Sequence, residues 1–224
     1  MSHLSRSVSY HKYQLKWRLT DAAAHLHRRR EDAAVSLTFD DGPHPGTTDL
    51  VLDILSDLSV KATFFCVGYS VRAHPELVRR MVAEGHTVGS HSFTHPYPQD
   101  LGLLSVSAEY AAGRRALETE VGCSSPLFRP PHGHVQFRTP PLLRCLRLDT
   151  WLWSVDPEDW RPNAHPREIA AAAARAQPGD VILLHDWVEQ PEAPEALDRS
   201  ATVAALPQIV ATVRGKGLRL EPLP

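Results

Sequence analysis

From residue 33 onward the chain alternates short apolar runs with longer amphipathic stretches. Short runs bounded by Gly, Pro and Asp are typical of buried strands, whereas apolar residues at every third or fourth position are typical of helices. We expect strands at residues 35–39, 62–67, 86–90, 127–129, 150–155, 181–185 and 218–220. We expect helices near residues 46–58, 72–84, 104–121, 136–146, 166–177 and 200–215.

This alternation predicts an α/β fold with a mainly parallel sheet, because strands joined through helices cross over and pair in the same direction. About seven such units suit a closed or nearly closed (β/α) barrel. A doubly wound open sheet is the competing architecture. The length of 224 residues fits one domain, which we place at residues 33–224.

Residues 1–32 differ from the rest in charge, with seven Lys or Arg against three acidic residues. Tyr10, Tyr13 and Trp17 recur at helical spacing, so this segment is predicted to be a basic amphipathic helix. Such a helix either packs on the outside of the main domain or touches an anionic lipid or polymer.

Composition excludes some classes of function. The formal net charge is −2, with 24 basic and 26 acidic residues, which does not favour nucleic-acid binding. The sequence has no apolar run long enough for a membrane-spanning helix and no visible signal peptide, so we expect a cytoplasmic protein. Three cysteines without paired spacing suggest neither a disulfide framework nor a zinc ribbon. Oligomeric state is not predicted.

Unusual polar residues gather where the predicted strands end. In parallel α/β folds these ends share one face, which is where active sites form. The residues are Asp40 and Asp41 after the first strand, His91 and His95 after the third, Arg129 after the fourth, Asp156 and Asp159 after the fifth, and His185 at the end of the sixth. The remaining histidines, His86 among them, fit surface or capping positions.

The pair His91 and His95 suggests a metal site. Pro96 disfavours helical geometry at His95, so a tight turn is expected to bring the two imidazoles together. Two imidazoles and one carboxylate offer three ligands to a divalent ion and leave positions open for water and substrate, which is typical of a catalytic site.

Asp40 and Asp41 would point to opposite faces of a regular strand, but the Gly42-Pro43 turn allows both carboxylates to reach one cavity. One of them could bind the metal ion while the other takes a proton from the attacking water. The alternative is that one Asp caps the following helix.

Three further groups could supply a cation, a hydrogen-bond donor and a general acid. Arg129 could pair with the basic carboxylate and orient it, and the rigid turn after it could fix the His132 amide as a donor to an oxyanion. His185, kept cationic by Asp159, could protonate a leaving amine. Each residue also has a plainer interpretation, as a surface arginine or a core histidine.

We also expect the pocket to have an apolar wall that contacts a small acyl group of the substrate. Trp160 and Leu183 are the candidates for it. Either could instead be ordinary packing.

Five motifs in order resemble the polysaccharide deacetylases of the NodB-homology type, carbohydrate esterase family 4. They are "TFDDGP" (38–43), "HSFTHP" (91–96), "RPPHG" (129–133), "DPEDW" (156–160) and "LLH" (183–185). The resemblance spans nearly all of residues 33–220. It implies a distorted (β/α) barrel and removal of acetyl groups from N-acetylglucosamine units in peptidoglycan, chitin or related glycans.

The resemblance also implies roles for single residues. Zinc, or else cobalt, nickel or manganese, would be held by Asp41, His91 and His95. Asp40 would be the general base with Arg129 oriented on it, and His185 the general acid tuned by Asp159. Leu183 and Trp160 would line the acetyl pocket.

The chain departs from this family pattern in two ways. His132 stands where the family commonly has an aromatic residue such as Tyr, and His134 follows closely, so a second imidazole could face the site. Relatives that act on cell-wall polymers are exported, whereas no signal is visible here. The substrate could therefore be a polymer, an oligosaccharide or a glycoconjugate, and peripheral membrane contact stays open.

Two alternative functions remain. One is hydrolysis of an acyl or formyl amide on a small molecule or lipid-linked sugar, and the other is glycan binding without catalysis.

Overall fold

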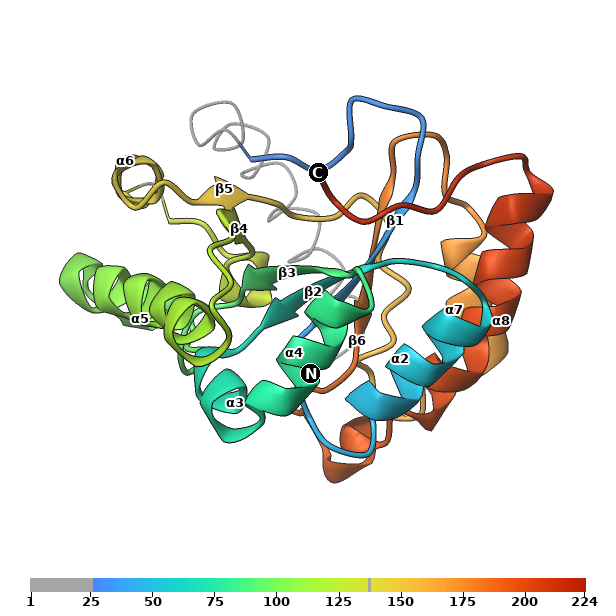
Figure 1. Cartoon of the computed structure of the whole chain (residues 1–224), viewed down its shortest axis with the longest axis horizontal. Helices are drawn as coiled ribbons and strands as arrows, with labels where there is room; N and C mark the ends of the chain where they lie inside the picture. Colours follow the sequence, from blue (N-terminus) through green and yellow to red (C-terminus); the bar gives the residue numbers. More distant parts are fainter. Residues whose placement is uncertain (1–25, 137) are drawn as a thin grey trace, which may run out of the picture.

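The computed structural model describes residues 26–136 and 138–224. Its sheet has six strands in the order β5-β4-β3-β2-β1-β6, and every neighbouring pair is parallel. Figure 1 shows the sheet curling between its surrounding helices. The strands are β1 Ser36–Asp40, β2 Thr63–Cys66, β3 Thr87–Ser90, β4 Leu127–Phe128, β5 Asp149–Thr150 and β6 Val181–His185.

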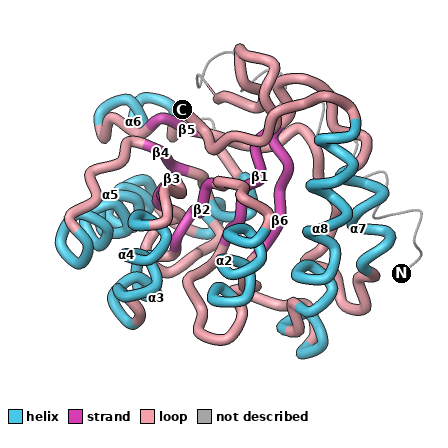
Figure 2. The backbone as a smooth tube through the Cα atoms, turned by 45° about the vertical axis from the view of Figure 1, so that its right-hand side comes forward, coloured by secondary structure: helices cyan, strands magenta, loops and turns pink. Residues whose placement is uncertain are grey.

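At least one helix lies in every connection between consecutive strands, as predicted. The α-helices are α2 Thr48–Asp57, α3 Gly68–Ala73, α4 Pro75–Ala83, α5 Leu103–Val121, α6 Pro140–Cys145, α7 Pro166–Ala173 and α8 Ser200–Gly215. Three of them begin with proline, whose missing N–H costs nothing at a first helical position. In Figures 1 and 2, α3, α4 and α5 lie beside β2 and β3, and α2, α7 and α8 lie beside β1 and β6.

Alternation along the central strands separates a core face from a site face. On β1, Leu37 and Phe39 belong to the large buried apolar cluster that the helices cover. Successive strand side chains point to opposite faces, so Thr38 and Asp40 point to the inside of the curled sheet, where both meet the Arg129 side chain. This alternation delivers polar groups to the interior of the barrel without interrupting the apolar core.

The predicted distorted barrel is confirmed, although its closure is irregular. The expected strand 150–155 forms only β5 and two isolated bridges, one of which pairs Val155 with Ile182 of β6. The chain after β5 therefore reaches the opposite edge of the sheet without a regular ladder. The expected strand at 218–220 is likewise reduced to one bridge between Leu220 and Val35.

Two helical predictions need correction. The single helix expected over 72–84 is two helices, because the pair His74-Pro75 interrupts it and Pro75 starts α4. The N-terminal prediction for 1–32 lies mostly outside the described residues. The described part of that segment is extended rather than helical: His27 bridges Trp151, and Arg29 bridges Asp180.

Backbone hydrogen bonds of His27 and Arg30 stabilise an extended chain over 26–30 and take precedence over its intrinsic helical preference. Within the described part of the chain, no helix combines the length and the apolar character needed to cross a membrane.

Candidate metal and acid-base site

The site lies at the carboxyl ends of neighbouring parallel strands. Asp40 is the last residue of β1, and it lies opposite His185, the last residue of β6, in the β1–β6 register. His91 follows β3 directly, and Arg129 follows β4. The fold therefore brings together residues that are separated by up to 145 positions in the sequence, as the strand-end argument predicted.

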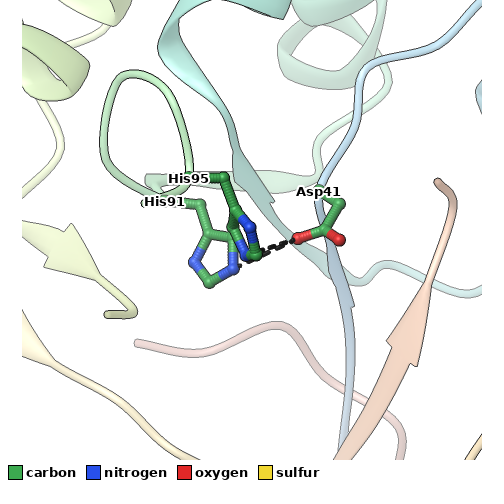
Figure 3. Close-up of side chains that lie close together, drawn as sticks. All are labelled: Asp41, His91 and His95. Atoms are coloured by element: carbon green, nitrogen blue, oxygen red, sulfur yellow. Dashed lines mark ion pairs between the residues drawn. The ribbon is translucent and has the colours of Figure 1, made fainter. Parts of the chain in front are cut away.

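Asp41, His91 and His95 form a buried three-residue cluster (Figure 3), which we call the metal-binding cluster because its three ligand atoms could hold a metal ion. Asp41 Oδ1 lies 3.3 Å from His91 Nε2 and 3.2 Å from His95 Nε2. This oxygen is buried and has no hydrogen-bond partner, which is costly for a carboxylate unless something else satisfies it. One oxygen and two imidazole nitrogens facing a common point fit a divalent cation with nitrogen and oxygen ligands.

The tautomer of His91 also fits cation binding. Its Nδ1 lies 2.7 Å from the carbonyl oxygen of Arg129. Because a carbonyl can only accept, Nδ1 carries the proton, and the lone pair of the neutral ring is on Nε2, on the side of Asp41. Burial lowers the pKa of His95 to about 4, against the opposing charge of Asp41. His95 is therefore neutral near pH 7, as a ligand must be.

Arg129 is fully buried and holds Asp40. Its Nη1 donates to Asp40 Oδ1 at 2.7 Å and to Thr38 Oγ1 at 2.8 Å. Its other nitrogens donate to the carbonyl oxygens of Trp151 and Leu152, each at 3.0 Å. Asp40 Oδ2, the other oxygen, faces His91 Nε2 at 3.6 Å. One oxygen of Asp40 is thus fixed, and the other is directed toward the metal-binding cluster.

His185 and Asp159 form the second charged pair of the site. Asp159 Oδ1 lies 2.8 Å from His185 Nδ1, and its Oδ2 accepts the backbone N–H of His185 at 2.9 Å. Burial by itself would lower the pKa of His185, but the charge and hydrogen bond of Asp159, with smaller contributions from Asp41 and Asp40, raise it to about 9. The ring is therefore protonated near neutral pH. Its side chain is 12% exposed, so it is not sealed from solvent.

His132 lies against the metal-binding cluster in a left-handed backbone conformation with φ of 56°. Its ring stacks on Tyr97 with a centroid distance of 3.7 Å and contacts His95 edge-on at 4.5 Å. Burial lowers its pKa to about 3, so the ring is a neutral wall of the site. The His134 ring lies 6.0 Å from the His132 ring, measured between centroids, and its Nδ1 is hydrogen-bonded to the Gln99 side chain at 2.8 Å.

The two remaining candidates are close in sequence to the His185–Asp159 pair. Leu183 is buried on β6, two residues before His185 and therefore on the same side of the strand. Trp160 is half-buried directly after Asp159, with the Arg161 guanidinium 5.5 Å from its ring centroid. The acetyl-pocket role of both residues stays a prediction.

Asp156, the remaining carboxylate of the predicted set, is buried, and burial raises its pKa to about 6.

Sequence reasoning missed several residues that hold the site together. Thr202 donates to Asp159 Oδ2 at 2.9 Å, and the buried Arg199 donates to the Asp159 carbonyl at 2.8 Å. Asp186, Glu189 and Gln190, which follow His185, contact the loops that carry the metal-binding cluster. Their only sequence signal was adjacency to a strand end that already carried a functional histidine.

Comparison with known proteins identifies a family. The family model for polysaccharide deacetylase matches residues 27–150. The chain is 37% identical over 195 residues to a chitooligosaccharide deacetylase of Bradyrhizobium sp. (strain ANU 289), covering 85% of this chain and 89% of that protein. It is 34% identical over 188 residues to a peptidoglycan-N-acetylglucosamine deacetylase of Bacillus cereus, covering 83% and 84%.

A solved structure matches the fold as well. A family 4 carbohydrate esterase from Streptomyces lividans in complex with acetate superimposes with a TM-score of 0.72 at 36% identity, covering 84% of this chain and 91% of that one.

Proposed function

Because the chain belongs to the polysaccharide deacetylase family, we propose that it hydrolyses the acetamide of an N-acetylated sugar to acetate and a free amine. The observation that carries this function is the unpartnered Asp41 Oδ1, buried between the Nε2 atoms of His91 and His95. A cation bound there would neutralise the Asp41 carboxylate and would accept the lone pairs of the two Nε2 atoms.

We propose zinc as the ion, because two imidazoles and one carboxylate are ligands that zinc accepts readily. When bound, the ion supplies Lewis-acid chemistry, polarising the amide carbonyl and making water more nucleophilic near neutral pH. Cobalt, nickel and manganese accept the same ligands, so the native metal has to be identified by analysis of the purified protein.

Asp40 is the proposed general base. Arg129 fixes its Oδ1, while its Oδ2 is directed toward the metal-binding cluster. A base held by one oxygen and open at the other can take the proton of the attacking water without reorienting during the reaction. Arg129 is thus a positioning residue for Asp40.

His185 is the proposed general acid. Its Nδ1 is engaged by Asp159, so the proton on Nε2 is the one available to the departing amine. A donor that is protonated at neutral pH and beside the base completes the hydrolysis: water adds to the carbonyl, Asp40 takes a proton, and His185 gives one to nitrogen. The His132 amide is proposed to stabilise the oxyanion, and Leu183 and Trp160 to enclose the acetyl methyl group.

The substrate is proposed to be a glycan containing N-acetylglucosamine. Support comes from relatives named chitooligosaccharide deacetylase and peptidoglycan-N-acetylglucosamine deacetylase, which match most of this chain. His132, stacked on Tyr97, is proposed to form one wall of the glycan site.

Acetate release tests this function directly. The metal-free chain, reloaded with Zn²⁺, should release acetate from soluble chitooligosaccharides and expose one amine for each acetate. His91→Ala should lose both the bound metal and the activity. Asp57→Asn, an exposed carboxylate on α2, is the control and should retain both. Formate release from small amides without acetate release would favour the small-molecule alternative, and glycan binding without either product would indicate a non-catalytic protein.

A further inference from the structure

We propose that segment 186–190, immediately after His185, is a strap that preorganises the cation site by holding Asp41 and His95 in their binding orientation. This inference rests on the proposed function, since it takes the cluster of Asp41, His91 and His95 to be a cation site. The segment carries no role in the reaction described above. It would act through the two ligands that it contacts.

Two of the three proposed ligands need such support. Asp41 and His95 have φ angles of 76° and 54°, in the left-handed region that non-glycine residues rarely occupy and that persists only when the surroundings enforce it. His91 is different, because its backbone N–H continues the sheet through a 2.8 Å bond to the carbonyl of Cys66. The sheet holds His91, but it does not reach the other two ligands.

Segment 186–190 contacts both of these ligands. The backbone N–H of Glu189 donates to Asp41 Oδ2 at 2.9 Å, so the carboxylate is oriented with Oδ1 toward the two imidazoles. The Gln190 side-chain amide donates to the carbonyl of His95 at 2.9 Å. Ser92 Oγ accepts the N–H of His95 at 3.1 Å, so both backbone groups of this ligand are held by side chains.

Asp186 fastens the beginning of the strap to the loop that carries Asp41. Its buried carboxylate accepts the N–H of Gly42 at 3.2 Å and the hydroxyl of Thr48 at 2.5 Å. A Cβ atom at Gly42 would overlap this carboxylate, so only glycine permits the approach. The strap is therefore attached at one end to the residue after Asp41 and at the other to the backbone of His95.

Gln190→Met provides the sharpest test, because it removes the amide donor without adding charge beside a cation. Gln190 is exposed, so its hydrogen bond is not needed to bury apolar surface. The probe is Zn²⁺ alone, titrated into the metal-free chain of residues 1–224 by calorimetry. Loss of an outer-shell partner typically weakens metal affinity by about 10- to 100-fold, and we expect an increase in Kd at the lower end of this range.

The matched control is Gln177→Met. Gln177 is also exposed and donates its side-chain amide to a backbone carbonyl, that of Arg175 at 3.1 Å, but it lies outside the cluster. Its Kd for Zn²⁺ should equal that of the wild-type chain. Asp186→Asn is the second test variant, since it replaces the acceptor of the Thr48 hydroxyl with an amide and should also weaken Zn²⁺ binding.

Thermal unfolding of the metal-free proteins separates orientation of ligands from ordinary structural support. Weaker Zn²⁺ binding by Gln190→Met, with an unchanged Tm of the metal-free chain and an altered visible spectrum of the Co²⁺-loaded chain, supports the strap. Wild-type affinity in both variants, or a loss of affinity that merely follows a lower metal-free Tm, overturns it. If the wild-type chain binds no Zn²⁺, or if His91→Ala binds as tightly, the cation site and the proposed function fail as well.

Discussion

Arg129 donates a 2.7 Å hydrogen bond to Asp40 from a position where neither side chain has appreciable contact with solvent. Burial lowers the pKa of Arg129, and the charge and hydrogen bond of Asp40 oppose that shift. The carbonyl oxygen of the same arginine accepts a hydrogen bond from His91 Nδ1. One residue thus orients both the proposed base and a proposed metal ligand.

Removing the Arg129 side chain should destabilise the fold. Arg129→Met leaves the Asp40 carboxylate buried without its partner, and breaking a buried ion pair on one side typically costs about 3 to 5 kcal/mol. Urea unfolding of the metal-free chain measures the change in the free energy of unfolding. The double variant Arg129→Met/Asp40→Asn removes the stranded charge and should recover part of the loss. Full stability of the single variant would contradict the importance of the pair.

Asp40→Asn should separate catalysis from metal binding. The amide keeps the size of the side chain and an oxygen that accepts from Arg129, but it cannot take a proton. We expect kcat for acetate release to fall by about a hundredfold or more, which is the usual contribution of a positioned general base. Zn²⁺ affinity should stay close to that of the wild-type chain. Normal turnover would reassign the base to another residue.

The Asp159 carboxylate should control the alkaline limb of activity. The pKa of His185 is raised to about 9, so the wild-type side chain is protonated at neutral pH. It loses its proton, and with it the ability to act as general acid, as the pH rises through about 9. Asp159→Asn removes the charge that opposes the effect of burial, and the pKa of His185 should fall. NMR titration of the His185 ring in the metal-free chain measures this shift. An unchanged titration would contradict the pairing.

The same pair makes a contribution to stability that depends on pH. Because the pKa of His185 is higher in the folded chain than the ordinary value of 6.5, its contribution is fully present below about pH 6.5 and is lost as the pH rises through about 9. Asp159→Asn should flatten this part of the stability profile in urea unfolding between pH 6 and pH 10.

His86 should weaken the fold under acidic conditions. Sequence placed it at the surface or in a cap, but its side chain is buried, and its Nδ1 accepts the N–H of Ala62 at 3.1 Å. Burial, with a smaller contribution from Lys61, lowers its pKa to about 4. The unfolded chain therefore binds the extra proton between about pH 6.5 and pH 4, and stability should fall as the pH decreases through this range.

His86→Asn should reduce this acid dependence of the free energy of unfolding. His165→Asn is the control, because His165 also accepts a backbone N–H, from Arg167, but is exposed. An equal acid dependence in wild type and His86→Asn would show that another group is responsible.

How far the sequence could predict the site is clear from Asp40 and Asp41. Their position after an apolar strand, followed by Gly-Pro, indicated two carboxylates reaching one cavity, and the spacing of His91 and His95 indicated the nitrogen ligands. Which carboxylate meets the imidazoles followed only from resemblance, and in the structure it depends on the left-handed backbone of Asp41. Side-chain periodicity does not encode such a loop conformation.

The amino-acid sequence alone determined the alternation of strands and helices, and with it a shared strand-end face, because hydrophobic period and strand-end position are local properties. Only the tertiary structure decided which groups meet there, such as Glu189 with Asp41 across 148 positions and Gln190 with His95 across 95. It also turned residues 26–30 into an extended segment and left 218–220 without a regular strand. The physical reason is that contacts between distant segments depend on register and loop geometry, which are fixed when the whole core packs together.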